Sequence, residues 1–467
     1  GQPVRRAAWA GWCFGLGWLV SGLWWLYISM HDFGGLAAPL AGLAVVLLAA
    51  ALALYPALAM AGVAVLRTGR PLADGLLFGG CWLASELARA QCLTGFPWIA
   101  SGYAHANGPL AALAPWLGVY GIGACAAVLA ATLATALAAQ WTQRRGGRPA
   151  SPATVWPVLV ALAPVVLALG LPADFTEPSG RLRISLLQPN VAQDLKFDPD
   201  RMVGNMQALQ AQLQTARGQL VLTPESVLPV PQADLDPAYW ASLVAPFVQG
   251  ERSALIGTFL GNDAEGYVNS LVGVSAAAHG TTDFYRYGKR HLLPFGEYVP
   301  PGFRWFVDLM QIPLGDQAHG RSEALFTVAG QRIRPLICYE DLFGEDFARS
   351  MVGPQSATVM ANASNLAWFG AWMIQDQHLQ FSRMRSLEFQ RPLVRATNTG
   401  ATAAIDHHGQ VTDRLPALTA GVLEVEVEGR SGDTPYARWL AAFGLWPAWA
   451  LVLVLCVSGR LARRWAT

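Results

Sequence analysis

Five long stretches without a charged residue constrain this chain more than any other feature of its sequence. They extend over about residues 9–29, 36–66, 110–140, 154–172 and 439–459. Each is near or above the roughly twenty residues that cross ~30 Å of hydrocarbon as a helix. A sixth stretch, 73–90, is interrupted by Glu86 and Arg89 near its end. Since 53% of the residues are hydrophobic and only 13% are charged, we expect a multi-pass membrane protein.

Arginines indicate the orientation of these predicted spans, because short cytoplasmic loops accumulate cations. They precede the first span, lie between spans two and three and between spans four and five, and follow the sixth: Arg5, Arg6, Arg67, Arg70, Arg144, Arg145, Arg148, Arg460, Arg463 and Arg464. Crossings that begin in the cytoplasm then place a long globular segment outside it. We predict a helical bundle over 1–172, an extracytoplasmic domain over 173–437, and a last helix with a basic tail over 438–467.

The predicted outer domain contains one cysteine, Cys338, within the sequence RPLICYEDLFGE. Its position alone favours a buried apolar filler, because free cysteine is among the most buried residue types. The flanking sequence favours chemistry instead, since residues 332–338 resemble a short apolar strand and a helical pattern with acids follows at once. Open α/β folds place reactive groups at such strand ends, and a helix N-terminus there would favour the thiolate.

Two further motifs of the same domain place charged residues in apolar surroundings. In GQLVLTPESVLP, a strand-like run ends at Glu225 between two prolines. In YGKRHLLPFGEYVP, Lys289 and Glu297 stand among aromatic and apolar residues. A carboxylate that accepts a thiol proton, a thiolate that attacks a carbonyl and an ammonium that stabilises the oxyanion together make a nucleophilic acyl-transfer site. We therefore predict that Glu225, Lys289 and Cys338 act together.

With these motifs, the chain resembles the nitrilase superfamily and, within it, the membrane-embedded apolipoprotein N-acyltransferases. The resemblance covers nearly the whole chain and includes SGLWWLYISMHDFGG at 21–35, LTGFPWIASGY at 93–103, SNLAWFG at 364–370, QHLQFSRMRSLEFQRPLVRATNTG at 377–400 and TPYAR at 434–438. It implies a membrane α-helical bundle plus an α/β nitrilase-like αββα-sandwich domain. It also implies that Glu225 is the general base, Lys289 the oxyanion partner and Cys338 the acyl-accepting nucleophile.

The family's reaction is a ping-pong transfer. An acyl chain passes from a phospholipid, usually phosphatidylethanolamine, to the cysteine as a thioester, and then to the α-amine of a lipoprotein's N-terminal diacylglyceryl-cysteine. The resemblance therefore implies the bilayer, a phospholipid donor and a lipoprotein acceptor as partners, with no nucleic acid. It implies a location in the bacterial inner membrane, with the catalytic domain in the periplasm.

No cofactor is expected, because a phospholipid ester already carries the acyl group. No metal site is expected either, since the eight histidines show none of the HExxH or CxxC partner spacing that is typical of zinc sites.

Further residues are expected around the predicted triad. The resemblance implies that Glu297 is an accessory glutamate near it. Tyr339 and Glu340 follow the nucleophile and are expected to shape the site, with Glu340 equally explained as a strand-end acid paired with an arginine. An acyl pocket is expected from four aromatic residues: Phe295, Trp368, Phe369 and Trp372. Ordinary core packing or a position at the bilayer interface would explain the tryptophans and Phe369 equally well.

The segment 300–315, PPGFRWFVDLMQIPLG, is apolar for a loop between site residues. It is read either as a mobile lid that touches lipid or as a packed connector. The chain also departs from the family pattern, with Leu366 where an Asp is frequent and Thr223 where a Trp is frequent. Members generally have eight membrane helices, and this chain begins at what resembles the third.

Two other functions remain open at this point. A membrane-anchored amidase of the same superfamily would use the same triad on water and a small amide. A transporter or an inactive lipid-binding scaffold would explain the predicted spans, but it would leave the motifs around Glu225, Lys289 and Cys338 without a role.

Overall fold

The protein is described by a computed structural model that covers residues 2–146, 155–170, 172–196, 198–276, 284–305, 316–322 and 324–464. The chain divides into two compact units. The helical unit comprises Gly1–Trp24, Pro39–Ala173 and Ala442–Thr467. The α/β unit comprises Asp174–Ala441 together with Trp25–Ala38, a segment that the sequence analysis assigned to the helical part.

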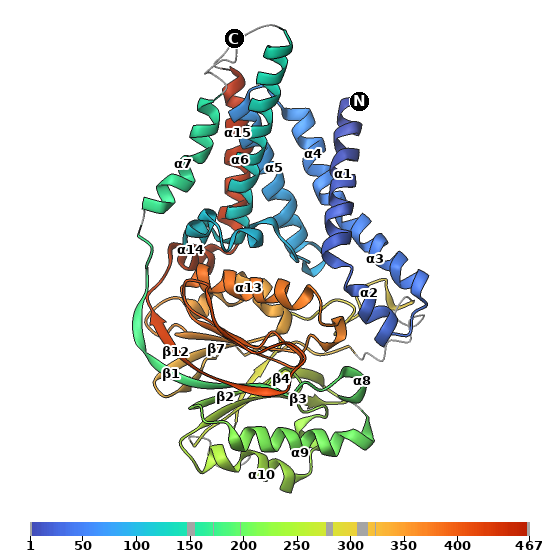
Figure 1. The fold of residues 1–467 in the computed structure, drawn as a ribbon, viewed down its shortest axis with the longest axis vertical. Coiled ribbons are helices and arrows are strands. Elements are labelled where there is room, and N and C mark those ends of the chain that lie inside the picture. Colours follow the sequence, from blue (N-terminus) through green and yellow to red (C-terminus); the bar gives the residue numbers. More distant parts are fainter. Residues whose placement is uncertain are drawn as a thin grey trace. The chain divides into compact units, whose positions relative to one another are not determined.

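Long apolar helices form the helical unit (Figure 1). They are α1 (Gln2–Leu23), α3 (Ala38–Leu52), α4 (Leu54–Leu66), α5 (Pro71–Gln91), α6 (Ala114–Arg145), α7 (Trp156–Gly170) and α15 (Trp446–Arg464). Among the described residues, two helical segments are long and apolar enough to cross a membrane, or up to four if each of two bent helix pairs is one span. Helices thus occur at each stretch that the sequence predicts to span a membrane. That all six stretches cross the membrane stays a prediction.

Small residues allow these helices to approach one another closely. A β-carbon added to Gly15 of α1 would lie 2.6 Å from Cγ of Pro56 in α4, too close for a larger side chain. A β-carbon on Gly79 of α5 would likewise overlap Val128 of α6. Such small residues at helix contacts are typical of helix packing in membranes, where close backbone approach replaces the hydrophobic effect as the source of packing energy.

The two charged residues that interrupt the predicted third span are both buried in α5. Glu86 accepts hydrogen bonds from the backbone N–H of Ser101 at 2.6 Å and from its hydroxyl at 3.1 Å. Arg89 donates to the carbonyls of Phe96 and Trp98 at 2.8 and 2.7 Å. Both side chains therefore hold the irregular segment that follows α5, which is a structural use of buried ionisable groups in the helical unit.

Two six-stranded sheets form the centre of the α/β unit, in the orders β12-β1-β2-β3-β4-β5 and β11-β10-β9-β8-β7-β6. The first sheet contains β1 (Glu177–Gln188), β2 (Leu220–Leu222), β3 (Ser253–Asn262), β4 (Gly266–Val274), β5 (Tyr285–Gly288) and β12 (Gly421–Ser431). The second contains β6 (Phe326–Val328), β7 (Gln331–Ile337), β8 (Val359–Ser364), β9 (Leu393–Thr397), β10 (Ala403–Ile405) and β11 (Val411–Arg414). Strands β1 to β3 are parallel, as are β7 to β9.

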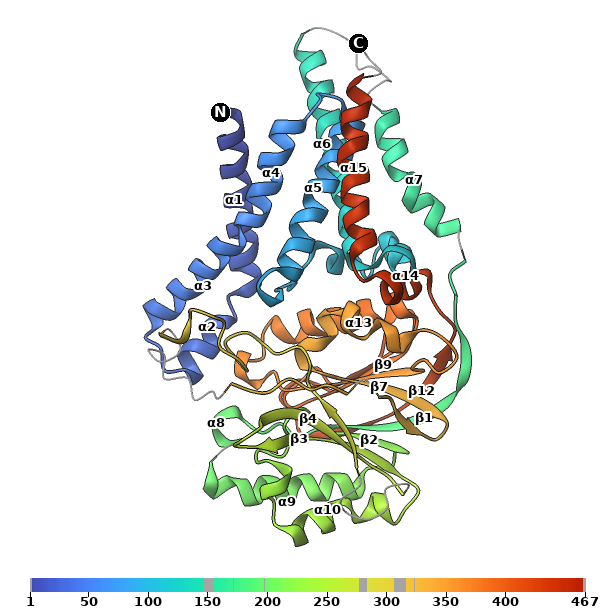
Figure 2. The same ribbon diagram turned by 180° about the vertical axis from the view of Figure 1, so that it is seen from behind.

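The layers of this unit follow from the alternation of side chains along the strands. In β2, Leu220 and Leu222 point into a core that both sheets share, whereas Val221 packs on the opposite face. Helices α9 (Pro199–Thr215) and α10 (Pro237–Val248) cover that opposite face, and α13 (Ile374–Phe389) covers the outer face of the second sheet (Figure 2). The predicted αββα sandwich is therefore confirmed.

Candidate active site

The residues predicted to act together lie just beyond the ends of three strands. Glu225 follows β2, Lys289 follows β5 directly, and Cys338 follows β7 directly. Since β2 and β7 belong to the parallel part of each sheet, their carboxyl ends supply loops where open α/β folds place their chemistry. The Cys338 thiol interacts electrostatically with both Glu225 and Lys289, so the structure brings the three residues into one site.

Lys289 is almost fully buried between two acids. Its Nζ lies 3.1 Å from Oε1 of Glu225 and 2.8 Å from Oε1 of Glu297. Burial alone would lower the pKa of Lys289, but the two carboxylates outweigh it and raise that pKa above its ordinary value. The surroundings of Lys289 therefore favour the charged ammonium.

The Glu225 carboxylate is fixed from two sides. Its Oε1 accepts a hydrogen bond from Nδ2 of Asn269 at 2.7 Å, and its Oε2 accepts one from the backbone N–H of Asn365 at 3.0 Å. The same amide of Asn269 also donates to Oε1 of Glu297 at 3.1 Å. Neither asparagine was predicted as a site residue, although Asn269 is a polar residue inside the apolar strand β4 and Asn365 lies in the SNLAWFG motif.

Cys338 has a left-handed backbone conformation, with φ of 50°, at the point where β7 ends. Such a conformation is costly for a non-glycine residue and is found where surrounding contacts hold it. One of those contacts is the hydrogen bond from Nδ2 of Asn362 to the Cys338 carbonyl, at 3.0 Å. The turn projects a half-buried thiol from a sharp bend between the strand and the next element.

The expectation that a helix N-terminus favours the thiolate is wrong for this site. The residues after the strand form a short 3-10 helix, Cys338–Leu342, in place of the expected α-helix. Burial and the nearby Glu225 carboxylate raise the pKa of Cys338, and these effects outweigh the opposing charge of Lys289. The surroundings of Cys338 therefore favour the thiol over the thiolate.

Glu340 holds the bend in place. Its Oε2 accepts hydrogen bonds from the N–H of Ile337 and from the hydroxyl of Tyr287, both at 2.7 Å, and its Oε1 accepts one from the N–H of Arg290 at 2.7 Å. It thus joins the nucleophile's strand to the loop that begins at Lys289. These contacts agree with the expectation that Glu340 shapes the site, which stays a prediction.

Tyr339 points into an aromatic cluster rather than into open space. It is buried, and its ring centroid lies 5.7 Å from that of His291 and 5.1 Å from that of Phe343. Its contribution is therefore packing beside the nucleophile.

The four aromatic residues expected to line a pocket have different surroundings. The ring of Phe369 contacts Trp25, with centroids 5.0 Å apart, and Trp368 contacts Phe33 at 5.7 Å. Phe295, with φ of 60°, contacts Phe303 at 5.4 Å. Trp372 is 69% exposed. These contacts describe packing, so the acyl pocket stays a prediction, and most of the proposed lid lies outside the described residues, at 306–315.

One buried cation near the site was missed from the sequence. Lys196, at the end of α8 (Gln193–Lys196), donates from Nζ to the hydroxyl of Ser226 at 2.8 Å. Burial lowers the pKa of Lys196 to about 8, with the Glu225 carboxylate opposing the decrease. Lys196 and Glu225 also line the same small cavity, together with Pro224 and Asn398.

Comparison with known proteins finds matches in both units and over nearly the whole chain. Residues 1–133 match the family described as the apolipoprotein N-acyltransferase N-terminal domain, and residues 183–436 match the carbon-nitrogen hydrolase family. The apolipoprotein N-acyltransferase of Verminephrobacter eiseniae is 48% identical over 464 residues, which cover 94% of this chain and 84% of that protein. The one from Ralstonia nicotianae is 45% identical, covering 99% of this chain and 86% of that protein.

A solved structure of a CN-hydrolase superfamily protein from Xanthomonas campestris is 19% identical to the matching part of this chain. It covers 57% of this chain and 96% of its own, with a TM-score of 0.40. The α/β unit is assigned to the carbon-nitrogen hydrolase family by the family match, and the two observed sheets agree with this assignment.

Proposed function

Because this chain belongs to the apolipoprotein N-acyltransferase family, we propose that it transfers a fatty acyl chain from a phospholipid to the N-terminal amine of diacylglyceryl-cysteine lipoproteins. The specific donor that we propose is phosphatidylethanolamine. The observation that carries the mechanism is the buried arrangement of Glu225, Lys289 and Glu297 beside the Cys338 thiol. A base, a fixed cation and a nucleophile in one buried site suit a ping-pong acyl transfer.

In the first half-reaction, Glu225 accepts the proton of the Cys338 thiol, and the sulfur attacks the ester carbonyl of the phospholipid. The oxyanion that forms is stabilised by the ammonium of Lys289, whose charge is already in place because two carboxylates hold its pKa high. The carbon–oxygen bond then breaks, and Glu225 returns the proton to the departing alkoxide. The products are a lysophospholipid and a thioester on Cys338.

In the second half-reaction, the amine of the lipoprotein attacks the thioester carbonyl and Glu225 accepts its proton. The carbon–sulfur bond breaks, the sulfur regains a proton, and an amide is left on the lipoprotein. Both substrates are anchored in a bilayer, which accounts for the apolar helices that precede and follow the α/β unit. Membrane anchoring also raises the local concentration of the attacking amine relative to water.

We further propose that the α/β unit lies in the periplasm of a multi-pass inner-membrane protein. The support is the distribution of arginines, which fall in alternate short loops. A reporter that is active only in the cytoplasm, fused near residue 300, should be silent, whereas strong activity there would reverse the proposed orientation.

Mass spectrometry of the purified full chain tests the transfer itself. After incubation with phosphatidylethanolamine vesicles, a fatty acyl mass should appear on Cys338 and should be absent from the Cys338→Ala variant. Adding a diacylglyceryl-cysteine peptide should then discharge the thioester. A wild-type rate of product formation in Cys338→Ala would refute the assignment of the nucleophile.

A second comparison separates the transferase from a membrane-anchored amidase. A soluble peptide without the diacylglyceryl group lacks the remote binding energy that orients its amine, so it should be a poor acceptor. Loss of the thioester to water at the same rate as to the lipidated peptide would favour the amidase.

A further inference from the structure

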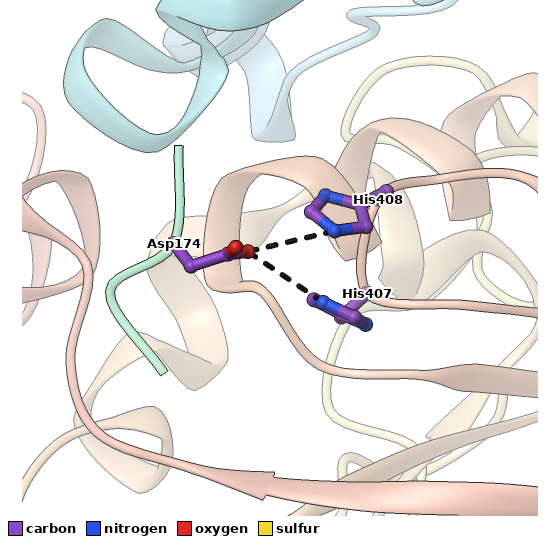
Figure 3. A group of neighbouring side chains, drawn as sticks. All are labelled: Asp174, His407 and His408. Carbon is purple, nitrogen blue, oxygen red and sulfur yellow. Dashed lines mark ion pairs between the residues drawn. The ribbon is translucent and has the colours of Figure 1, made fainter. Parts of the chain in front are cut away.

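Two neighbouring histidines and a distant aspartate meet outside the candidate active site (Figure 3). Asp174 lies at the start of the α/β unit, shortly before β1. His407 and His408 lie in the turn between β10 and β11, more than two hundred residues later in the chain. The carboxylate of Asp174 faces both imidazole rings from one side, and the dashed lines in Figure 3 join it to each ring.

The distances in this cluster differ from those of hydrogen bonds. Oδ1 of Asp174 lies 3.6 Å from Nε2 of His407 and 3.5 Å from Nε2 of His408. Nitrogen–oxygen hydrogen bonds are about 2.7–3.2 Å long. With metal–ligand bonds of roughly 2.0–2.2 Å, however, two ligand atoms of a tetrahedral zinc site lie about 3.3–3.6 Å apart. The two Asp174–histidine separations therefore suit ligands of one tetrahedral ion, and all three ligand atoms lie within 4.8 Å of one another.

The charged groups around the cluster suit the same role. Arg430 and the carboxylates of Asp174 and Asp406 all act electrostatically on His407. The positive charge of Arg430 is partly neutralised, because its guanidinium is 3.0 Å from Oε1 of Glu428 and also donates to the backbone of Thr176. The Asp174 and Asp406 carboxylates act on His407 in the opposite sense to Arg430, which favours a bound cation.

We propose that Asp174, His407 and His408 bind one divalent transition-metal ion of the zinc type, with water in the remaining position. Two imidazoles and one carboxylate select zinc, copper or nickel over magnesium or calcium, which prefer oxygen ligands. The ion would fasten the segment before β1 to the β10–β11 turn. Its role is structural, because none of its ligands belongs to the candidate active site.

Metal binding by the full chain tests this proposal directly. Wild-type protein purified in detergent, with any affinity tag removed and metals stripped by a chelator, is dialysed against ZnCl₂ and its zinc content is measured. The wild type should bind one zinc ion more than the Asp174→Asn variant, and isothermal titration should show affinity in His408→Asn weakened by more than about tenfold. MgCl₂ should give no such difference. Asp413→Asn, which removes an exposed carboxylate from the same hairpin, is the matched control and should bind like the wild type.

A thermal shift provides a second readout that does not depend on catalysis. An ion that binds only the folded state raises the melting temperature. ZnCl₂ should therefore raise it in the wild type and in Asp413→Asn, but not in Asp174→Asn or His408→Asn. Both variants replace exposed side chains, so folding is expected to survive without metal. Equal zinc binding by wild type and both cluster variants would overturn the proposal, as would zinc binding that MgCl₂ displaces at equal concentration.

Discussion

The ammonium of Lys289 donates to Oε1 of Glu297 at 2.8 Å. A second acid, Glu225, shares the same ammonium at 3.1 Å, so one buried cation serves two carboxylates. Burial and the neighbouring Glu225 raise the pKa of Glu297, with Lys289 opposing the increase. Glu297 thus shares the charge of Lys289 with Glu225, for which we propose the role of base.

We predict that Glu297→Gln slows formation of the Cys338 thioester by roughly 10²-fold, the lower end of the range for a group that supports proton transfer. Glutamine can still accept a hydrogen bond from Lys289, but it lacks the charge that helps to keep the ammonium buried and protonated. Single-turnover acylation followed by mass spectrometry measures the rate. Glu428→Gln, which alters a more exposed acid of β12, should leave it unchanged. A Glu297→Gln rate within twofold of the wild type would contradict the role.

The second prediction concerns the hydrogen bond from Tyr287 to Glu340. Because the hydroxyl donates at 2.7 Å to a buried carboxylate, Tyr287→Phe should lower the free energy of unfolding by about 2 kcal/mol. Tyr239→Phe is the matched control, since its hydroxyl donates at 3.0 Å to the neutral carbonyl of Met206, and the expected loss is about 1 kcal/mol. Denaturant unfolding of the full chain in detergent measures both. Equal losses would show that Glu340 is not held as a charged acceptor.

The third prediction concerns Trp25, which is 2% exposed and lies in the segment Trp25–Ala38 of the α/β unit. Its indole donates to Oε1 of Gln377 at 3.0 Å, and its ring packs on Phe369, close in sequence to the Asn365 N–H that binds Glu225. Trp25→Ala should cost about 3 kcal/mol of stability and should slow acylation by loosening that loop.

Trp24→Ala is the control for this experiment, because Trp24 is adjacent and 37% exposed. It should leave the melting temperature and the acylation rate close to those of the wild type. If Trp25→Ala acylates Cys338 at the wild-type rate, the segment is attached to the α/β unit without supporting the site.

Much of the α/β unit was predictable because its strands and its chemistry have local sequence signals. The apolar runs before Glu225 and Cys338 predicted strands, and β2 ends at Leu222, shortly before Glu225, while β7 ends at Ile337, directly before Cys338. The backbone at Cys338 was not predictable, since the left-handed bend is held by Asn362 from the neighbouring strand β8, and by Glu340, which is itself bound by the distant Tyr287. The raised pKa of the thiol follows from the same burial.

Residues that act through distant partners were missed for a related reason. Asn269 lies in the strand β4, and only the folded sheet brings its amide to Glu225. Metal-site patterns depend on short spacings, so they could not detect a cluster in which Asp174 meets His407 and His408. The pair of adjacent histidines was the one local signal of that cluster, and it lacks a partner until the chain is folded.

The last prediction concerns the pH dependence introduced by Lys196. In the folded protein the pKa of Lys196 is lowered to about 8, whereas in the unfolded chain it is near the ordinary 10.5. Below pH 8 both states bind the proton, and burial of the charge costs up to about 3 kcal/mol. Between pH 8 and 10.5 the unfolded chain binds more protons at this residue, so this cost is progressively relieved as the pH rises.

Lys196→Met should therefore be more stable than the wild type at pH 7, and the difference should shrink towards pH 10, as measured by melting temperature in detergent. Arg201→Met, which removes an exposed cation from α9, should show no such convergence. The Lys196→Met variant also tests whether the buried cation beside Ser226 and Glu225 takes part in the reaction. If the variant is more stable but acylates more slowly, Lys196 lowers the stability of the fold and supports the reaction. We expect that support to come from its hydrogen bond to Ser226, which helps to hold the loop that carries Glu225. Unchanged acylation would assign it no part in the reaction.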